Sequence, residues 1–201
     1  MRRIIAILLL SQLLLATQCD NDDAPRYFLN KFDVKVSPQA SYNINDTIWI
    51  EGKVSAKAYD ATVNDSILYT LEPFTDYVSV MKLIAPTQSG NSVAAIDKFQ
   101  LINSVGSNEF LGFCPNSDMV IYTELNPAQT FYTYKIGLKA TQSGDYLLKC
   151  SNIVNITNYH NEIANSYLSS DFPNQIMFNK CGYTSWQEIN SVNPIYFFKV
   201  N

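Results

Sequence analysis

The sequence has little histidine and little glycine. One histidine, His160, and seven glycines occur among 201 residues. A single histidine excludes the multi-histidine sites that hold most catalytic zinc ions. A Ser-His-Asp triad needs only one histidine, but no Gly-x-Ser-x-Gly turn between a strand and a helix accompanies His160. A glycine-rich phosphate loop is also absent. The sequence therefore predicts no metal site and no cofactor.

Charge is also scarce. Charged residues make up 16% of the chain, and the formal net charge is −4. No stripe of lysine and arginine is present to neutralise nucleic-acid phosphates, so we predict no nucleic-acid partner. A basic patch for an anionic membrane surface is equally missing. Any membrane attachment must therefore come from another feature of the chain.

The amino-terminal stretch has the pattern of an export signal. Arg2 and Arg3 precede an apolar run from Ile4 to Leu15. This run is shorter than the roughly 20 apolar residues that cross a bilayer, and it has the length of a signal-peptide core. Cys19 follows closely after the apolar run. In the simplest alternative the signal is an ordinary secretory one and Cys19 has no special role.

The run Leu15-Ala16-Thr17-Gln18-Cys19 resembles the end of a bacterial lipoprotein signal, in which leucine and two small residues precede a cysteine. Leu15 stands one place early, and Gln18 is larger than the usual residue. The resemblance implies acylation of Cys19 and attachment to the outer membrane of a cell envelope. The three acyl chains of a mature bacterial lipoprotein are enough for stable anchoring. The acidic run 20–23 then forms a solvated tether, and we expect surface display, with a periplasm-facing protein as the alternative.

The remaining chain predicts a mainly β domain. Apolar and polar residues alternate along several short stretches, as in half-buried strands, and polar turns separate them. Strands are predicted at 32–37, 47–56, 67–71, 77–84, 93–102, 119–125, 130–140 and 194–200. The stretch 146–150 is expected to return beside 130–140 as a hairpin. We therefore divide the chain into a signal peptide (1–18), a lipidated tether (19–30) and a single antiparallel β-sandwich (31–201).

Two features refine this fold. The run Gly-Asp-Tyr-Leu-Leu-Lys-Cys at 144–150 resembles the tyrosine corner of immunoglobulin-like domains, although four residues instead of two separate Tyr146 from Cys150. This resemblance implies an immunoglobulin-like sandwich. Ile163 and Tyr167 recur at helical spacing within 158–170, which predicts a short helical insertion near the carboxyl terminus.

Three further cysteines, Cys114, Cys150 and Cys181, follow Cys19. In an oxidising compartment two of the three are expected to pair. We favour a Cys150–Cys181 disulfide because these two residues flank one irregular segment. Its closure would stabilise the fold by about 3 kcal/mol. The sequence alone leaves the other pairings open.

Aromatic residues provide the candidate binding site. The chain has 13 tyrosines, 11 phenylalanines and two tryptophans, Trp49 and Trp186. Trp49 alternates with Ile48 and Ile50, so it points away from the core and is a candidate for ligand stacking, as is Trp186. The alternative is that these aromatic rings pack in the core or under a helix.

Three functions fit these features. The first is a non-catalytic binding or interaction module for a glycan, a peptide or another envelope protein. The second is a structural subunit of an envelope assembly. The third is a glycoside hydrolase with a pair of acids about 5 to 10 Å apart. Its nominal candidates are Glu51, Asp97, Glu109 and Asp118, which are otherwise ordinary exposed charges.

Overall fold

The computed structural model describes residues 27–39, 41–70, 74–88, 90–112, 116, 118–150, 161–167, 171 and 195–201. Its contacts divide the chain into two compact units. Described residues 27–29 and 58–67 belong to the smaller unit, and the other described residues belong to the larger one. The signal peptide, Cys19 and the acidic run 20–23 lie outside the described residues, whereas residues 27–30 at the end of the predicted tether are described.

The smaller unit is built on a three-stranded sheet in the order β1 (Tyr27–Phe28), β5 (Lys57–Asp60) and β6 (Asp65–Leu68). Strands β1 and β5 are antiparallel. The Thr62 backbone N–H and hydroxyl both donate to Asp60 Oδ1, at 2.8 and 2.6 Å. These hydrogen bonds lower the pKa of Asp60 and hold the turn that follows β5.

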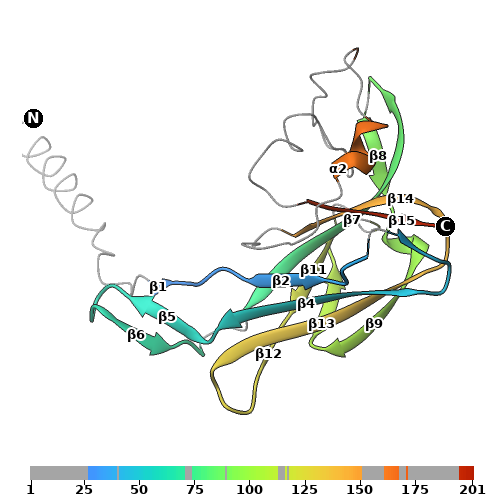
Figure 1. The fold of residues 1–201 in the computed structure, drawn as a ribbon. Helices are drawn as coiled ribbons and strands as arrows, with labels where there is room; N and C mark the ends of the chain where they lie inside the picture. Colours follow the sequence, from blue (N-terminus) through green and yellow to red (C-terminus); the bar gives the residue numbers. More distant parts are fainter. Residues whose placement is uncertain are drawn as a thin grey trace, which may run out of the picture. The chain divides into compact units, whose positions relative to one another are not determined.

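The larger unit contains two sheets (Figure 1). The first sheet is antiparallel and runs from β2 through β4 to β13, with β9 and β12 both paired to the far side of β13. Its strands are β2 (Asp33–Val36), β4 (Thr47–Ser55), β9 (Phe99–Val105), β12 (Glu124–Leu125) and β13 (Phe131–Ala140).

The second sheet has the order β10-β11-β7-β14-β15-β3, and β8 also pairs with β7. Its edge strand β3 lies parallel to β15, and its other pairings are antiparallel. The strands are β3 (Ser41–Tyr42), β7 (Thr75–Thr87), β8 (Gly90–Ala94), β10 (Ser107–Phe110), β11 (Asp118–Tyr122), β14 (Gly144–Cys150) and β15 (Ile195–Val200).

The core lies between these sheets and confirms the predicted alternation. On β4, Ile48, Ile50 and Val54 are at most 2% exposed, while Glu51 and Lys53 on the same strand are exposed. Strands β2 and β13 show the same period of two. On β15, Tyr196, Phe198 and Val200 face this core, while Ile195 and Phe197 are buried in a second cluster. The larger unit is therefore sandwich-like, as the sequence predicted.

One buried hydrogen bond links the two sheets. The Tyr134 hydroxyl on β13 donates to Asp76 Oδ2 on β7 at 2.7 Å, and both residues are buried. A Cβ on Gly52 would lie only 2.0 Å from the Tyr134 ring. The glycine at position 52 therefore permits a close approach of the Tyr134 ring to β4.

Cys150 is buried and carries a free thiol. Burial raises the pKa of this thiol well above its ordinary value, and the charge of Asp76 raises it further. Cys114 and Cys181 lie outside the described residues. The structure gives Cys150 as free, so it does not support the predicted Cys150–Cys181 disulfide.

A helical segment covers part of the outer face of the second sheet. Helix α2 (Asn161–Asn165) contributes Ala164, which packs with Leu147 and Phe197, while Ile163 and Tyr167 pack against the same cluster. The Tyr167 hydroxyl also donates to Asp145 Oδ2 at 2.6 Å. The predicted helical insertion spans 158–170, and its residues 158–160 and 168–170 lie outside the described residues. No helix in the described ranges is both long and apolar enough to span a membrane.

Two strand predictions are wrong. Strand β13 belongs to the first sheet and β14 to the second, so 130–140 and 146–150 cross between layers instead of forming a hairpin. Both strands alternate, but the alternation does not say which sheet each one joins. The predicted strand 93–102 is interrupted by a 3-10 turn, η1 (Ile96–Lys98), which separates β8 from β9.

The chain also crosses between sheets at Gly106. Strand β9 pairs in the first sheet and β10 in the second, with Gly106 between them at a φ of 81°. A Cβ at this position would lie 2.3 Å from the carbonyl oxygen of Tyr122. Glycine therefore permits both the left-handed backbone and the close contact.

Candidate functional site around Trp49

Trp49 lies on the outer face of the first sheet, opposite to the core. Its neighbours Ile48 and Ile50 are fully buried, whereas Trp49 is only half-buried. Across the sheet it occupies a row with Ser37 on one side and Gly137 on the other. This row, Ser37–Trp49–Gly137, is the centre of the candidate site.

Gly137 makes room for the indole. It is the register partner of Trp49 on β13. A Cβ on Gly137 would lie 3.0 Å from Trp49 Cζ3 and 2.8 Å from Thr47 Cγ2. The indole therefore lies across the glycine in space that any other side chain would fill. Lys135 Nζ lies 5.0 Å from the centroid of the indole, within the range of a cation–π contact.

Ser37 holds the other side of Trp49. The Ser37 N–H donates to the Trp49 carbonyl at 3.0 Å, and the Trp49 N–H donates to Ser37 Oγ at 2.9 Å. The Ser37 carbonyl turns toward the core, where the hydroxyls of Tyr42 and Tyr196 each lie 2.8 Å from its oxygen. These tyrosines are nearly fully buried, and burial raises the pKa of each. Two strands of the second sheet thus fix the edge of the Trp49 site.

A cavity of about 430 Å³ lies beside the indole. This volume falls within the range of about 300 to 1,000 Å³ that is usual for small-molecule sites. Its walls come from β2, the residues just after it, and β4. They are Asp33, Lys35, Val36, Ser37, Pro38, Trp49 and Glu51.

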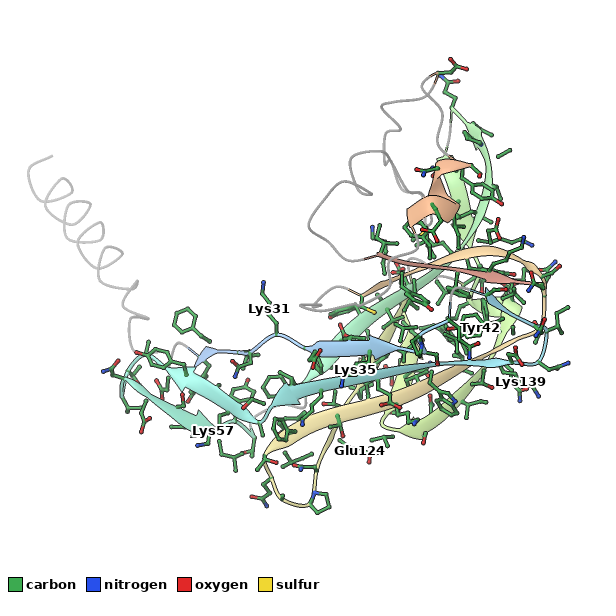
Figure 2. All side chains as sticks on the ribbon, viewed as in Figure 1. Lys31, Lys35, Tyr42, Lys57, Glu124 and Lys139 are labelled. Atoms are coloured by element: carbon green, nitrogen blue, oxygen red, sulfur yellow. The ribbon has the colours of Figure 1, made fainter. Side chains whose placement is uncertain are left out.

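Charged residues flank the indole. Glu51 Oε1 lies 2.6 Å from Lys135 Nζ, and their side chains are 50% and 39% exposed. Such an exposed pair contributes at most about 1 kcal/mol. Its main consequence is to hold Glu51 toward β13 and Lys135 beside the indole. Lys35 extends from the neighbouring strand β2 (Figure 2).

The structure brings only two of the four nominal acids together. Glu109 and Asp118 share the outer face of β10 and β11 as diagonal neighbours, a relation that places Cβ atoms about 7–8 Å apart. The Tyr122 hydroxyl donates to Glu109 at 3.1 Å, and the Ser79 hydroxyl donates to Asp118. The hydrogen bond to Glu109 raises the pKa of Tyr122.

The other predicted site residues lie apart or outside the description. Asp97 forms an ion pair at 2.8 Å with its neighbour Lys98 on η1, and Glu51 belongs to the Trp49 site. Trp186 and His160 lie outside the described residues. The described residues contain no group of three or more metal-ligating side chains.

Sequence reasoning identified Trp49 but missed the residues that position it. The outward pattern of Thr133, Lys135 and Lys139 includes Gly137, and a glycine inside a strand signals a close approach. The sequence did not show that β4 would place an indole there, because that depends on strand register.

Comparisons with known proteins leave the site to be interpreted from its geometry. No protein-family model matches the chain, and no curated protein matches it.

Proposed function

We propose that the protein is a lipid-anchored cell-envelope module that binds a glycan in the Trp49 cavity. The observation that carries this proposal is the half-buried indole in the wall of a 430 Å³ cavity, held in place by Gly137 and Ser37. Sugar rings present C–H faces that pack on an aromatic surface, and their hydroxyls need nearby polar groups. Asp33, Lys35 and Glu51 supply such groups along one wall.

A glycan fits this site better than an apolar partner does. Exposed charges and an ion pair surround the indole on the outer face of the first sheet. A protein interface of an envelope assembly would be expected to lose charge and gain apolar area at its centre. A cavity with an indole wall and a few charged side chains is instead suited to a small hydroxylated ligand.

Membrane attachment rests on the sequence. We propose that Cys19 carries the lipid, that residues 19–30 tether the sandwich to the outer membrane, and that the domain faces the outside of the cell. The acidic run 20–23 and the export signal support this arrangement. A surface location would give the Trp49 cavity access to extracellular glycans.

We also propose that the sandwich is immunoglobulin-like. In immunoglobulin domains, strands A, B, E and D form one sheet in that order, and strands C, F and G form the other. When the strands are lettered in chain order, β2-β4-β13-β9 corresponds to A-B-E-D, and β7-β14-β15 corresponds to C-F-G. The Tyr146 hydroxyl donates to the Gln142 carbonyl at 3.0 Å, at the corner between β13 and β14. This hydrogen bond resembles the one that the tyrosine corner makes in such domains, which supports the proposal.

The direct test is glycan binding by the protein that is expressed with its own leader and then purified in detergent. We expect Trp49→Ala to abolish retention on a glycan array while the unfolding midpoint stays near that of the wild type. Phe110→Ala removes another exposed aromatic ring, 51% exposed on β10, and serves as the control. Equal binding by Trp49→Ala and the wild type would refute the proposal.

The hydrolase alternative has its own result. Glu109 and Asp118 are the two of the four nominal acids that the structure brings together. The assay measures release of reducing sugar from a retained glycan. If this activity is lost in Glu109→Gln and kept in Glu51→Gln, the protein is a hydrolase instead of a binding module.

A further inference from the structure

The charge around Trp49 follows the register of three strands. The row next to Trp49 consists of Lys35, Glu51 and Lys135, which are mutual partners across β2, β4 and β13. Its formal net charge is one positive. The row on the other side pairs Thr47 with Lys139 and is also positive by one charge. The indole therefore lies between two positive rows, in a protein whose net charge is −4.

Lys35 is the cation that this arrangement leaves available. Glu51 has a lysine opposite it on each neighbouring strand, and its carboxylate binds Lys135 at 2.6 Å. Within the part of the chain that the structure describes, Lys35 forms no ion pair. It lines the cavity together with Trp49. The charge of its ammonium group is therefore not neutralised by the carboxylate directly across from it.

The distances of Lys35 and Asp33 from Trp49 along the strands determine which charged group a stacked sugar would contact. Adjacent rows on one face are two residues apart, which is about 6.8 Å. Lys35 is one row from Trp49, whereas Asp33 is two rows away, or about 14 Å along the strand. A sugar on the indole thus reaches Lys35 with its ring substituents, and only a second sugar unit reaches Asp33.

We infer that the ligand is an anionic saccharide, whose ring stacks on Trp49 and whose carboxylate or sulfate binds Lys35. This inference rests on the proposed glycan-binding function and names its substrate class. Lys139 adds attraction from the row on the other side of the indole, and Asp33 accepts a hydroxyl of the next unit. The cavity is open to solvent, so dissolved salt screens the attraction between Lys35 and the anionic group of the ligand. Binding therefore weakens as the salt concentration rises.

The test compares hexagalacturonate with its methyl ester, which keeps the sugar ring and removes the charge. Calorimetric titration of the detergent-purified protein should give about tenfold tighter binding of the acid, as expected for one charge-assisted hydrogen bond. Lys35→Gln should lose this preference and keep the ester affinity. Lys199→Gln, which removes an exposed lysine from β15, should behave like the wild type.

The outcomes separate the two claims. Equal, Trp49-dependent binding of acid and ester would overturn the anionic ligand and leave the glycan site standing. If Lys35→Gln weakens binding of the acid and of the ester to a similar extent, Lys35 has a structural role. This result would also overturn the anionic ligand. The wild type is also titrated with chondroitin sulfate and with chondroitin. If it binds none of these four ligands, both the glycan site and the anionic ligand are refuted.

Discussion

Gly137 and Trp49 show how one residue prepares a surface for another. The indole is a large apolar group on the outer face of the first sheet, and it needs support to stay in one orientation. Gly137 supplies the space, and Lys135 lies 5.0 Å from the ring centroid. The site therefore depends on the absence of a side chain as much as on the aromatic ring.

Gly137→Ala should displace the indole. The new Cβ would lie 2.8 Å from Thr47 Cγ2 and 3.0 Å from Trp49 Cζ3. We expect ligand affinity to fall about tenfold, as for the loss of one good contact, and the free energy of unfolding to change by less than about 1 kcal/mol. Fluorescence in a Trp186→Phe background would report Trp49 alone. Gly112→Ala, where a Cβ meets no atom within 4 Å, is the matched control; identical spectra and affinities for both variants would contradict the proposed support.

Buried tyrosines should make the protein sensitive to alkali. Burial raises the pKa of Tyr146 to about 12, and burial also raises the pKa of Tyr134 and Tyr196. In the unfolded chain these phenols lose their protons near pH 10. Between about pH 10 and 12 the unfolded state thus binds fewer protons than the folded state, so the free energy of unfolding falls as pH rises.

Denaturant midpoints measured from pH 8 to pH 12 would check this prediction. We expect a nearly constant midpoint below about pH 9 and a steady fall above about pH 10. Tyr146→Phe should flatten part of that fall, although it also removes the hydrogen bond to Gln142 at every pH. A midpoint that does not change up to pH 12 would show that these phenols titrate equally in both states.

At the level of elements, β4 and β13 pack through a matched glycine and tyrosine. Gly52→Ala would place a Cβ 2.0 Å from the Tyr134 ring, so we expect it to destabilise the fold by about 1–3 kcal/mol, as overpacking does. In a Tyr134→Leu background the same substitution should cost at least about 1 kcal/mol less, because the ring is gone. A double-mutant cycle by denaturant unfolding measures this coupling, and fully additive costs would rule out the contact as its cause.

The elements also show what periodicity can predict. Alternation correctly assigned the buried and exposed faces of β2, β4 and β13, including the outward position of Trp49. On β15 it correctly separated two faces, but both are buried. It failed for β13 and β14, because both sides of a sandwich have the same period and only long-range pairing assigns a strand to a sheet. The Lys35–Glu51–Lys135 row was hidden for the same reason, since its members come from three separate strands.

At the scale of the whole molecule, the outer faces of the larger unit differ. Residues 163, 164 and 167 pack on part of the second sheet, with Leu147 and Phe197 beneath them. The outer face of the first sheet carries Trp49, its cavity and the lysines. We propose that this outer face is the one that binds soluble glycans.

Cys19→Ser tests the tether. Without the thiol no acyl chain can be attached, and the hydrophobic contribution of about 0.8 kcal/mol per buried CH₂ is lost. We expect the variant to leave the membrane fraction while keeping its glycan affinity. Protease treatment of intact cells that carry a carboxyl-terminal tag should remove the tag from the wild type. Protection of the tag until lysis would place the domain in the periplasm, and a Cys19→Ser protein that stays in the membrane would contradict lipidation.

The central claim is that a saccharide stacks on Trp49, and indole NMR tests it most directly. The chain has two tryptophans, so Trp186→Phe assigns the Trp49 Nε1–H resonance. During titration with hexagalacturonate we predict a saturable shift of this resonance, with the same midpoint as calorimetric binding. Calorimetric binding that leaves the Trp49 resonance unchanged would place the ligand elsewhere and contradict the claim.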